Sequence, residues 1–387
     1  MTSINKRIIG LDLLRSIALF MAVFGHCATL FNPLIHLPIV GNLIGKTLAL
    51  HEIIAFSGVE IFFVLSGFLI ADILFKYFNN TQNHYPKYYL FLIRRWLRTL
   101  PNYYLLLLIN IILYVWILKE QPFDWRFLFF IQNLNYPPTD FYRESWSLAT
   151  EEWFYFLFPL VLIILQSYKT FSFKQNVLLT CTLFLLFSIA LKTIHILQYG
   201  ADIDFDGNIR KVTLLRFDNL ILGILCYTVF YFYRPFFFKY KNILLGLGIL
   251  LFIVSVVSFY AAFKNNFLLY HHQSSVAFLC NYCFLLALGL AFTFVIPKLY
   301  QLNLDKYQYF SAFIKKTSQL SYSIYLINLP LYKLLFFRNN LLPDSIGSSF
   351  LFILLFIAIN YSIAFIIYQY FELPFLKFRD EKFPNLY

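Results

Sequence analysis

Apolar stretches of about 20 residues recur along the whole chain, and this feature limits its possible folds most strongly. A helix of that length can cross a bilayer, and in lipid only helices and closed barrels satisfy their own backbone hydrogen bonds. Hydrophobic residues make up 60% of the 387 positions and charged residues 13%. The sequence therefore predicts an all-α, polytopic membrane bundle with about ten transmembrane helices. The predicted spans are residues 8–31, 51–78, 99–118, 146–167, 176–198, 212–233, 242–262, 274–297, 318–337 and 347–371.

Lysine and arginine are distributed unevenly between the two sides of this predicted bundle. With the N-terminus in the cytoplasm, 19 of the 31 basic residues fall in cytoplasmic segments and 8 in outer loops. Basic residues collect in cytoplasmic loops of membrane proteins, so both termini are predicted to be cytoplasmic. The same rule accounts for the net charge of +12 without a nucleic-acid partner. The loops are short, so we expect one domain over residues 1–387 and no separate soluble domain.

The first span carries two ionisable residues, Arg15 and His26, that its stability does not require. An ionisable group at bilayer depth costs about 2.5–3.5 kcal/mol or more. Eleven positions separate the two, so they leave one face of a helix about 16 Å apart along its axis. Asp12 lies one turn from Arg15, and we expect these two to pair. A polar stripe predicts a functional site, and the structural alternative is a histidine bonded to a backbone carbonyl beside a snorkelling arginine.

Three arginines precede a proline at the cytoplasmic start of the third span. Arg94 and Arg98 are one helical turn apart, and Arg95 is three positions from Arg98. Guanidinium groups suit phosphate oxygens, because their planar donors match the oxygens in pairs. The alternative is an ordinary basic flank that touches lipid head groups.

The fourth span begins with polar groups at helical spacing. Ser147 and Glu151 are one turn apart, and so are Glu151 and Tyr155. These residues can serve acid–base chemistry or donate to an oxyanion. The structural alternative is a serine that caps the helix, with acids that favour its N-terminal dipole.

Two more apolar segments contain charges. Glu60 lies within the second span, six residues before a Ser66–Gly67 pair that permits close helix approach. Arg216 and Asp218 lie within the sixth span, where we expect a mutual ion pair.

The outer loop before the sixth span has alternating acids, Asp202, Asp204 and Asp206, followed by Gly207. This pattern matches the opening of a calcium loop, but the twelfth position is Thr213 and not the usual glutamate. A solvated acidic loop is therefore favoured over a calcium site, and no metal is expected.

Taken together, these segments resemble the membrane acyltransferase-3 family, whose members O-acylate cell-surface sugars and polysaccharides. The resemblance extends from residue 8 to residue 375 and rests on several motifs in order. One position departs from the family: Asn328 stands where histidine is common, which leaves the role of that position open. The matching motifs are Arg15 with His26 after ten residues, Gly58–Leu69, Arg94–Pro101, Ser147–Tyr155, Arg216–Asp218, Ser321–Leu326 and Glu372–Pro374.

The resemblance implies a multi-pass enzyme of the bacterial inner membrane that uses acetyl-CoA as its co-substrate. It would transfer an acetyl group to a hydroxyl of a glycan or lipid-linked sugar, such as lipopolysaccharide, capsule or peptidoglycan. The CoA phosphates would meet Arg94, Arg95 and Arg98 on the cytoplasmic side, with Arg15 deeper in the bundle.

The resemblance also implies catalytic roles. His26 would be the general base for the acceptor hydroxyl or a nucleophile that holds the acetyl group. Glu60 or Glu151 would orient His26, and Tyr155 or Ser147 would donate to the developing oxyanion. Two alternatives remain open: a transporter of a glycan or acyl compound, and the same enzyme with another donor such as succinyl-CoA.

Overall fold

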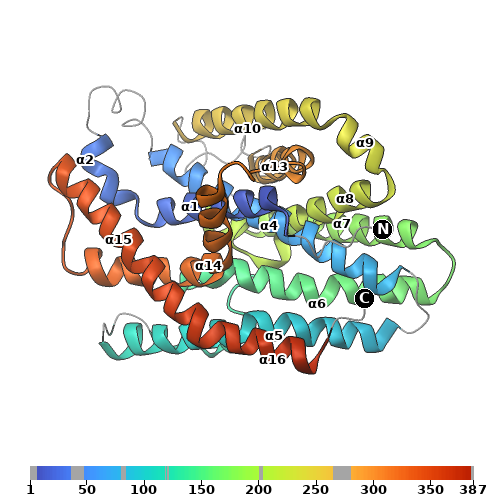
Figure 1. Ribbon diagram of the computed structural model, residues 1–387, viewed down its shortest axis with the longest axis horizontal. Coiled ribbons are helices and arrows are strands. Elements are labelled where there is room, and N and C mark those ends of the chain that lie inside the picture. The colour runs from blue at the N-terminus through green and yellow to red at the C-terminus, as the bar shows by residue number, and fades with distance from the viewer. Residues whose placement is uncertain are drawn as a thin grey trace.

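The structure is a computed structural model that describes residues 7–35, 48–79, 84–117, 119, 122–199, 204–264 and 280–384. Its regular elements are helices, and no strand occurs within those ranges (Figure 1). The α-helices are α1 (Ile9–His26), α2 (Asn32–Ile35), α4 (Leu48–Phe78), α5 (His84–Asn110), α6 (Trp146–Ser167), α7 (Phe173–Tyr199), α8 (Asp218–Phe232), α9 (Arg234–Lys239), α10 (Lys241–Lys264), α13 (Leu285–Tyr300), α14 (Gln308–Tyr332), α15 (Ile346–Ile367) and α16 (Leu373–Lys382).

In the part of the chain that the structure describes, eight helical segments are long and apolar enough to cross a membrane. The prediction of an all-α polytopic membrane protein is therefore confirmed. These segments are Ile9–His26, Ile53–Phe78, Tyr85–Ile117, Arg143–Ser167, Phe173–Gln198, Lys241–Phe259, Tyr282–Tyr300 and Ile346–Lys382.

The third, sixth and ninth predicted spans differ from the prediction. Helix α5 begins at His84 and not near residue 99, so the arginine cluster lies within the helix and not at its start. Residues 212–217 form a 3₁₀ turn and a short connection, so α8 has only 15 residues. The ninth lies within α14, which begins at Gln308 and includes the polar residues Lys315 and Lys316. Both helices bury much of their surface against other helices, so neither needs a long apolar face towards lipid.

Helix α4 lies inside the bundle, against α1 on one side and α8 on the other (Figure 1). Its sequence is apolar around its whole circumference, as expected for a helix that other helices surround. Gly67 and Gly223 allow α4 and α8 to meet backbone to backbone: a Cβ on Gly67 would lie 1.9 Å from the Leu220 carbonyl oxygen. The expectation of close helix approach at Ser66–Gly67 is confirmed.

We expect Gly67→Ala to lower the free energy of unfolding by about 1–3 kcal/mol, because the added methyl group must push the α8 backbone away. Gly246→Ala on α10 is the matched control, since nothing lies within 4 Å of the position that its added methyl group would take. That change should stabilise the protein by up to about 1 kcal/mol, as alanine favours helix over glycine. Thermal unfolding in detergent measures both variants, and equal melting temperatures would contradict the close contact.

Two apolar cores fill the bundle. One joins residues of α4, α6, α7, α8 and α13, and the other joins the second half of α5 with α14, α15 and the segment before α6. Phe62 and Trp153 pack against both cores. A cavity lies where these two cores meet, so its walls come from helices that are far apart in the sequence.

Candidate functional site

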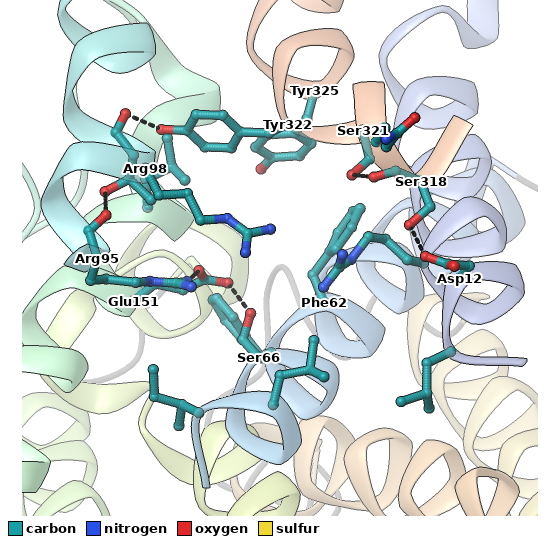
Figure 2. Close-up of a pocket in the computed structure, with 18 of the residues that line it drawn as sticks. Asp12, Phe62, Ser66, Arg95, Arg98, Glu151, Ser318, Ser321, Tyr322 and Tyr325 are labelled. Atoms are coloured by element: carbon teal, nitrogen blue, oxygen red, sulfur yellow. Dashed lines mark hydrogen bonds and ion pairs between the residues drawn. The ribbon is translucent and has the colours of Figure 1, made fainter. Parts of the chain in front are cut away.

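A cavity of about 540 Å³ is lined by residues of α1, α4, α5, α6, α14 and α16. Figure 2 shows Arg95, Arg98 and Glu151 on one side of it and Asp12 with Ser318 on the other. Predicted site residues that line this cavity are Arg15, Arg95, Arg98, Ser147 and Glu151. The tertiary structure thus brings together groups that lie on different helices.

Arg15 is half-buried and faces the cavity from α1. The predicted pairing with Asp12 is wrong, because other donors hold the Asp12 carboxylate. The Arg7 Nε donates to Asp12 Oδ2 at 2.6 Å, and the Ser318 hydroxyl donates to Oδ1 at 2.5 Å. Arg15 makes no hydrogen bond or ion pair with any residue in the described ranges. Its guanidinium is therefore available to an anion in the cavity.

Arg95 belongs to a network on the opposite wall. Its guanidinium donates to the Tyr155 hydroxyl at 2.6 Å, lies 4.0 Å from that ring centre and pairs with Glu151 at 3.5 Å. Tyr155 donates to one Glu151 oxygen and Ser66 to the other, each at 2.8 Å. Both Glu151 oxygens are thus engaged here, and the predicted orientation of His26 by Glu151 is wrong. The Tyr155 hydroxyl likewise donates its single hydrogen bond to the Glu151 carboxylate.

The arginine cluster of α5 divides into two groups. Arg98 points into the cavity (Figure 2) and has no hydrogen bond or ion pair among the residues described. Arg94 does not line the cavity; its guanidinium donates to Asp380 at 2.9 Å and to the Phe383 carbonyl. The two side chains are one turn apart, yet only Arg98 is open to a ligand.

His26 ends α1, and its ring Nδ1 is hydrogen-bonded to the Asn328 side-chain oxygen. The Asn328 amide nitrogen donates to the carbonyls of Ile324 and Tyr325, at 3.2 and 2.5 Å. Carbonyls only accept, so the nitrogen must face them and the oxygen must face the imidazole. His26 therefore carries its proton on Nδ1 when neutral, and Nε2 is the basic nitrogen.

Asn328 is the residue whose role the family resemblance left open, and the structure gives it a contact with His26. The sequence did contain a signal, because Asn328 is a polar residue within an apolar stretch of α14. It lies three positions after Tyr325, so both occupy one face of that helix.

Tyr325 connects His26 to the cavity, which it lines. The ring centres of Tyr325 and His26 are 6.5 Å apart, and Phe62 meets Tyr325 edge to face at 6.0 Å. The Tyr325 hydroxyl donates to the Glu144 carbonyl at 3.1 Å and lies 2.9 Å from the Ser147 hydroxyl. Since the Tyr325 hydroxyl has a single proton, the Ser147 hydroxyl donates to it. This hydrogen bond holds Ser147 against the aromatic wall that Tyr325 and Phe62 form.

Glu60 lies in a separate ionic cluster in the core. Its carboxylate meets Arg216 at 2.6 Å, and both side chains have no exposed surface. Arg216 lies 3.5 Å from Asp218, which also pairs with Lys192 at 2.7 Å. The predicted Arg216–Asp218 pair is confirmed. The predicted contact of Glu60 with His26 is wrong, because Arg216 and Asn219 hold the Glu60 carboxylate.

The acidic loop before α8 makes contacts within the protein. Asp202 lies outside the described residues, and Asp204 accepts the backbone N–H groups of Asp206 and Gly207. Burial alone would raise the pKa of the Asp206 carboxyl, but Arg210 and Lys211 hold that pKa below its usual range. Asp204 is exposed as predicted, whereas Asp206 is an ion-paired group and not a solvated one.

Comparison with known proteins gives a match to a protein family over most of the chain. Residues 8–369 match the model of a family described as an acyltransferase domain. Peptidoglycan O-acetyltransferase OatA of Listeria monocytogenes is 35% identical over 128 residues, which are 28% of this chain and 20% of that protein. Putative peptidoglycan O-acetyltransferase YrhL of Bacillus subtilis is 33% identical over 128 residues, 28% of this chain and 19% of that protein.

A third relative covers more of the chain. Putative O-acetyltransferase SACOL0978 of Staphylococcus aureus is 25% identical over 232 residues, 53% of this chain and 36% of that protein. Each of these matches thus spans well under half the length of the relative. No solved structure matches this chain.

Proposed function

This chain belongs to the acyltransferase-3 family, and on that premise we propose that it transfers an acetyl group from acetyl-CoA to a hydroxyl of a glycan or lipid-linked sugar. The observation that carries the proposal is the cavity itself. It has free guanidinium groups in its lining and an aromatic wall that contacts a histidine with a defined basic nitrogen.

The free cations suit the phosphates of an acyl-CoA. Arg98 and Arg15 line one cavity from different helices, and neither has a partner among the described residues. Arg95 is held in place by Tyr155 and Glu151, so it can add charge without moving. About 16 Å of helix axis separates Arg15 from His26, which suits an extended thioester chain. CoA is cytosolic, so this basic end would face the cytoplasm of a bacterial inner membrane, as the charge distribution also predicts.

The chemistry requires one base and one leaving group. His26 Nε2 takes the proton of the acceptor hydroxyl as its oxygen attacks the thioester carbonyl carbon. The tetrahedral intermediate then collapses, the carbon–sulfur bond breaks, and the CoA thiolate receives the proton from the imidazolium. Throughout, Asn328 accepts the Nδ1 hydrogen bond, which keeps the ring oriented and stabilises its charged form.

We expect Arg98→Gln and Arg15→Gln each to raise the KM for acetyl-CoA by about tenfold or more, because each removes a charged donor to phosphate. Arg338→Gln is the control, since Arg338 is exposed and does not line the cavity. Transfer of labelled acetyl groups by protein in nanodiscs measures the KM values. An unchanged KM in both cavity variants would show that these two arginines do not bind the phosphates.

The rival function is transport, which moves a glycan or acyl compound without forming an ester. Purified protein should transfer label from acetyl-CoA to a glycan acceptor, and the product should gain the mass of an acetyl group. Surface glycan from deletion and complemented cells should show the same mass difference. Export of unmodified glycan by a protein that never consumes acetyl-CoA would favour the transporter instead.

A further inference from the structure

The C-terminal helix α16 forms part of the cavity wall although it has no buried residue of its own. It runs beside α5 (Figure 1), and Leu376 and Arg379 are its two residues in the cavity lining. A surface helix of this kind needs specific contacts to keep its place. Those contacts involve Arg94, which the family resemblance assigned to phosphate binding.

Arg94 holds the end of α16. Its side chain is only 12% exposed, and it donates to the Asp380 carboxylate at 2.9 Å and to the Phe383 carbonyl. Both partners belong to the last residues that the structure describes. These bonds connect the start of the arginine cluster to a helix of the cavity wall.

Asp380 is shared between two arginines. Arg379 donates to both Asp380 oxygens, at 2.9 and 3.0 Å, while Arg94 donates to one of them. Two guanidinium groups on one carboxylate leave one positive charge uncompensated. Arg379 lies in the cavity wall with Arg98 and Arg15. Its guanidinium can therefore donate to a phosphate that enters the cavity, while Arg94 continues to neutralise the Asp380 carboxylate.

We propose that Arg379 is a further ligand for the phosphates of the acyl-CoA, and that Arg94 is a positioning residue that holds α16 and Arg379 at the cavity. This inference rests on the proposed function, since it concerns the donor of that same site. It reassigns Arg94 from a direct ligand to a residue that acts through Arg379.

The first test compares two donors. Arg379→Gln should raise the KM for acetyl-CoA by about tenfold and leave the KM for acetyl-pantetheine, which has no phosphate, unchanged. Lys377→Gln removes a charge from the same helix at an exposed position that does not line the cavity, and it should leave both KM values unchanged. An equal rise for both donors would indicate a structural defect and would overturn the ligand role.

The second test separates positioning from direct binding. If Arg94 acts through Arg379, the double variant Arg94→Gln/Arg379→Gln should have the same KM for acetyl-CoA as Arg379→Gln alone. Arg94→Lys, which keeps a charged donor, should retain most of the affinity. Additive effects of the two substitutions would show that Arg94 contacts the donor itself.

The outcomes also separate this inference from the function on which it depends. If the unmodified protein neither binds nor consumes acetyl-CoA, the proposed function and this inference both fail. If it uses acetyl-CoA and Arg379→Gln does so with the same KM, only this inference is overturned. Isothermal titration with CoA, alongside the transfer assay, gives a reading of phosphate binding that does not depend on catalysis.

Discussion

His26→Ala is expected to lower the rate of acetyl transfer by about 10²- to 10⁴-fold, the usual contribution of a positioned general base. The imidazole does not line the cavity itself: its ring centre lies 6.5 Å from that of Tyr325, which does, and its contact with Asn328 defines its basic nitrogen. Its removal leaves the guanidinium groups in place, so the affinity for acetyl-CoA should change little. Single-turnover transfer and CoA titration of the same preparation measure the two quantities.

Asn328→Ala is the companion variant. It removes the acceptor for the Nδ1 proton and leaves His26 itself in place, so the rate should fall by about tenfold, less than in His26→Ala. The two effects should not add, because Asn328 acts on catalysis through His26. Full activity in His26→Ala, in protein that melts at the normal temperature, would refute the catalytic role of this histidine.

Arg216→Met is expected to lower the free energy of unfolding by about 3–5 kcal/mol, because it leaves the Glu60 carboxylate buried without its cation. Both side chains have no exposed surface, and their atoms lie 2.6 Å apart. The double variant Arg216→Met/Glu60→Leu should recover much of the loss, since it removes the uncompensated charge as well. Unfolding in detergent, followed by denaturant titration, measures all three proteins.

Arg126→Met provides a matched control for this cluster. Arg126 pairs with Asp124 at 2.7 Å, but the arginine side chain is 32% exposed. A pair that solvent reaches is screened and contributes about 0–1 kcal/mol, so this loss should be small. If Glu60→Leu/Arg216→Met were stable yet inactive, Glu60 would have a part in the reaction that its contacts with Arg216 and Asn219 do not indicate.

The sequence predicted the features that depend on the chain near each residue. Apolar length located most of the membrane-spanning helices, and helical spacing placed Ser147 and Glu151 in one cavity wall. The Arg216–Asp218 pair was also predictable, because its two members are neighbours in the chain. Apolar length could not show that α8 is short or that α14 begins at Gln308, since other helices bury much of both.

Contacts between distant helices could not be predicted in the same way. Asn328 meets His26 across 302 positions, Asp380 meets Arg94 across 286, and Ser318 meets Asp12 across 306. For each of these residues, sequence proximity or a family motif had predicted a different partner. The physical reason is that helical spacing defines the face on which a side chain lies but not the helix opposite that face.

By itself, then, the sequence determined an all-α membrane bundle, a polar stripe on its first helix and a cluster of three arginines. The tertiary structure alone decided which of those charges are already paired and which are open to a ligand. An ionic or hydrogen-bonding group in a bundle takes the nearest complementary group in space, because leaving it unpaired in a medium of low polarity is costly. Packing of the helices brings Asp380 to Arg94, Ser318 to Asp12 and Asn328 to His26, and leaves Arg15 and Arg98 facing the cavity.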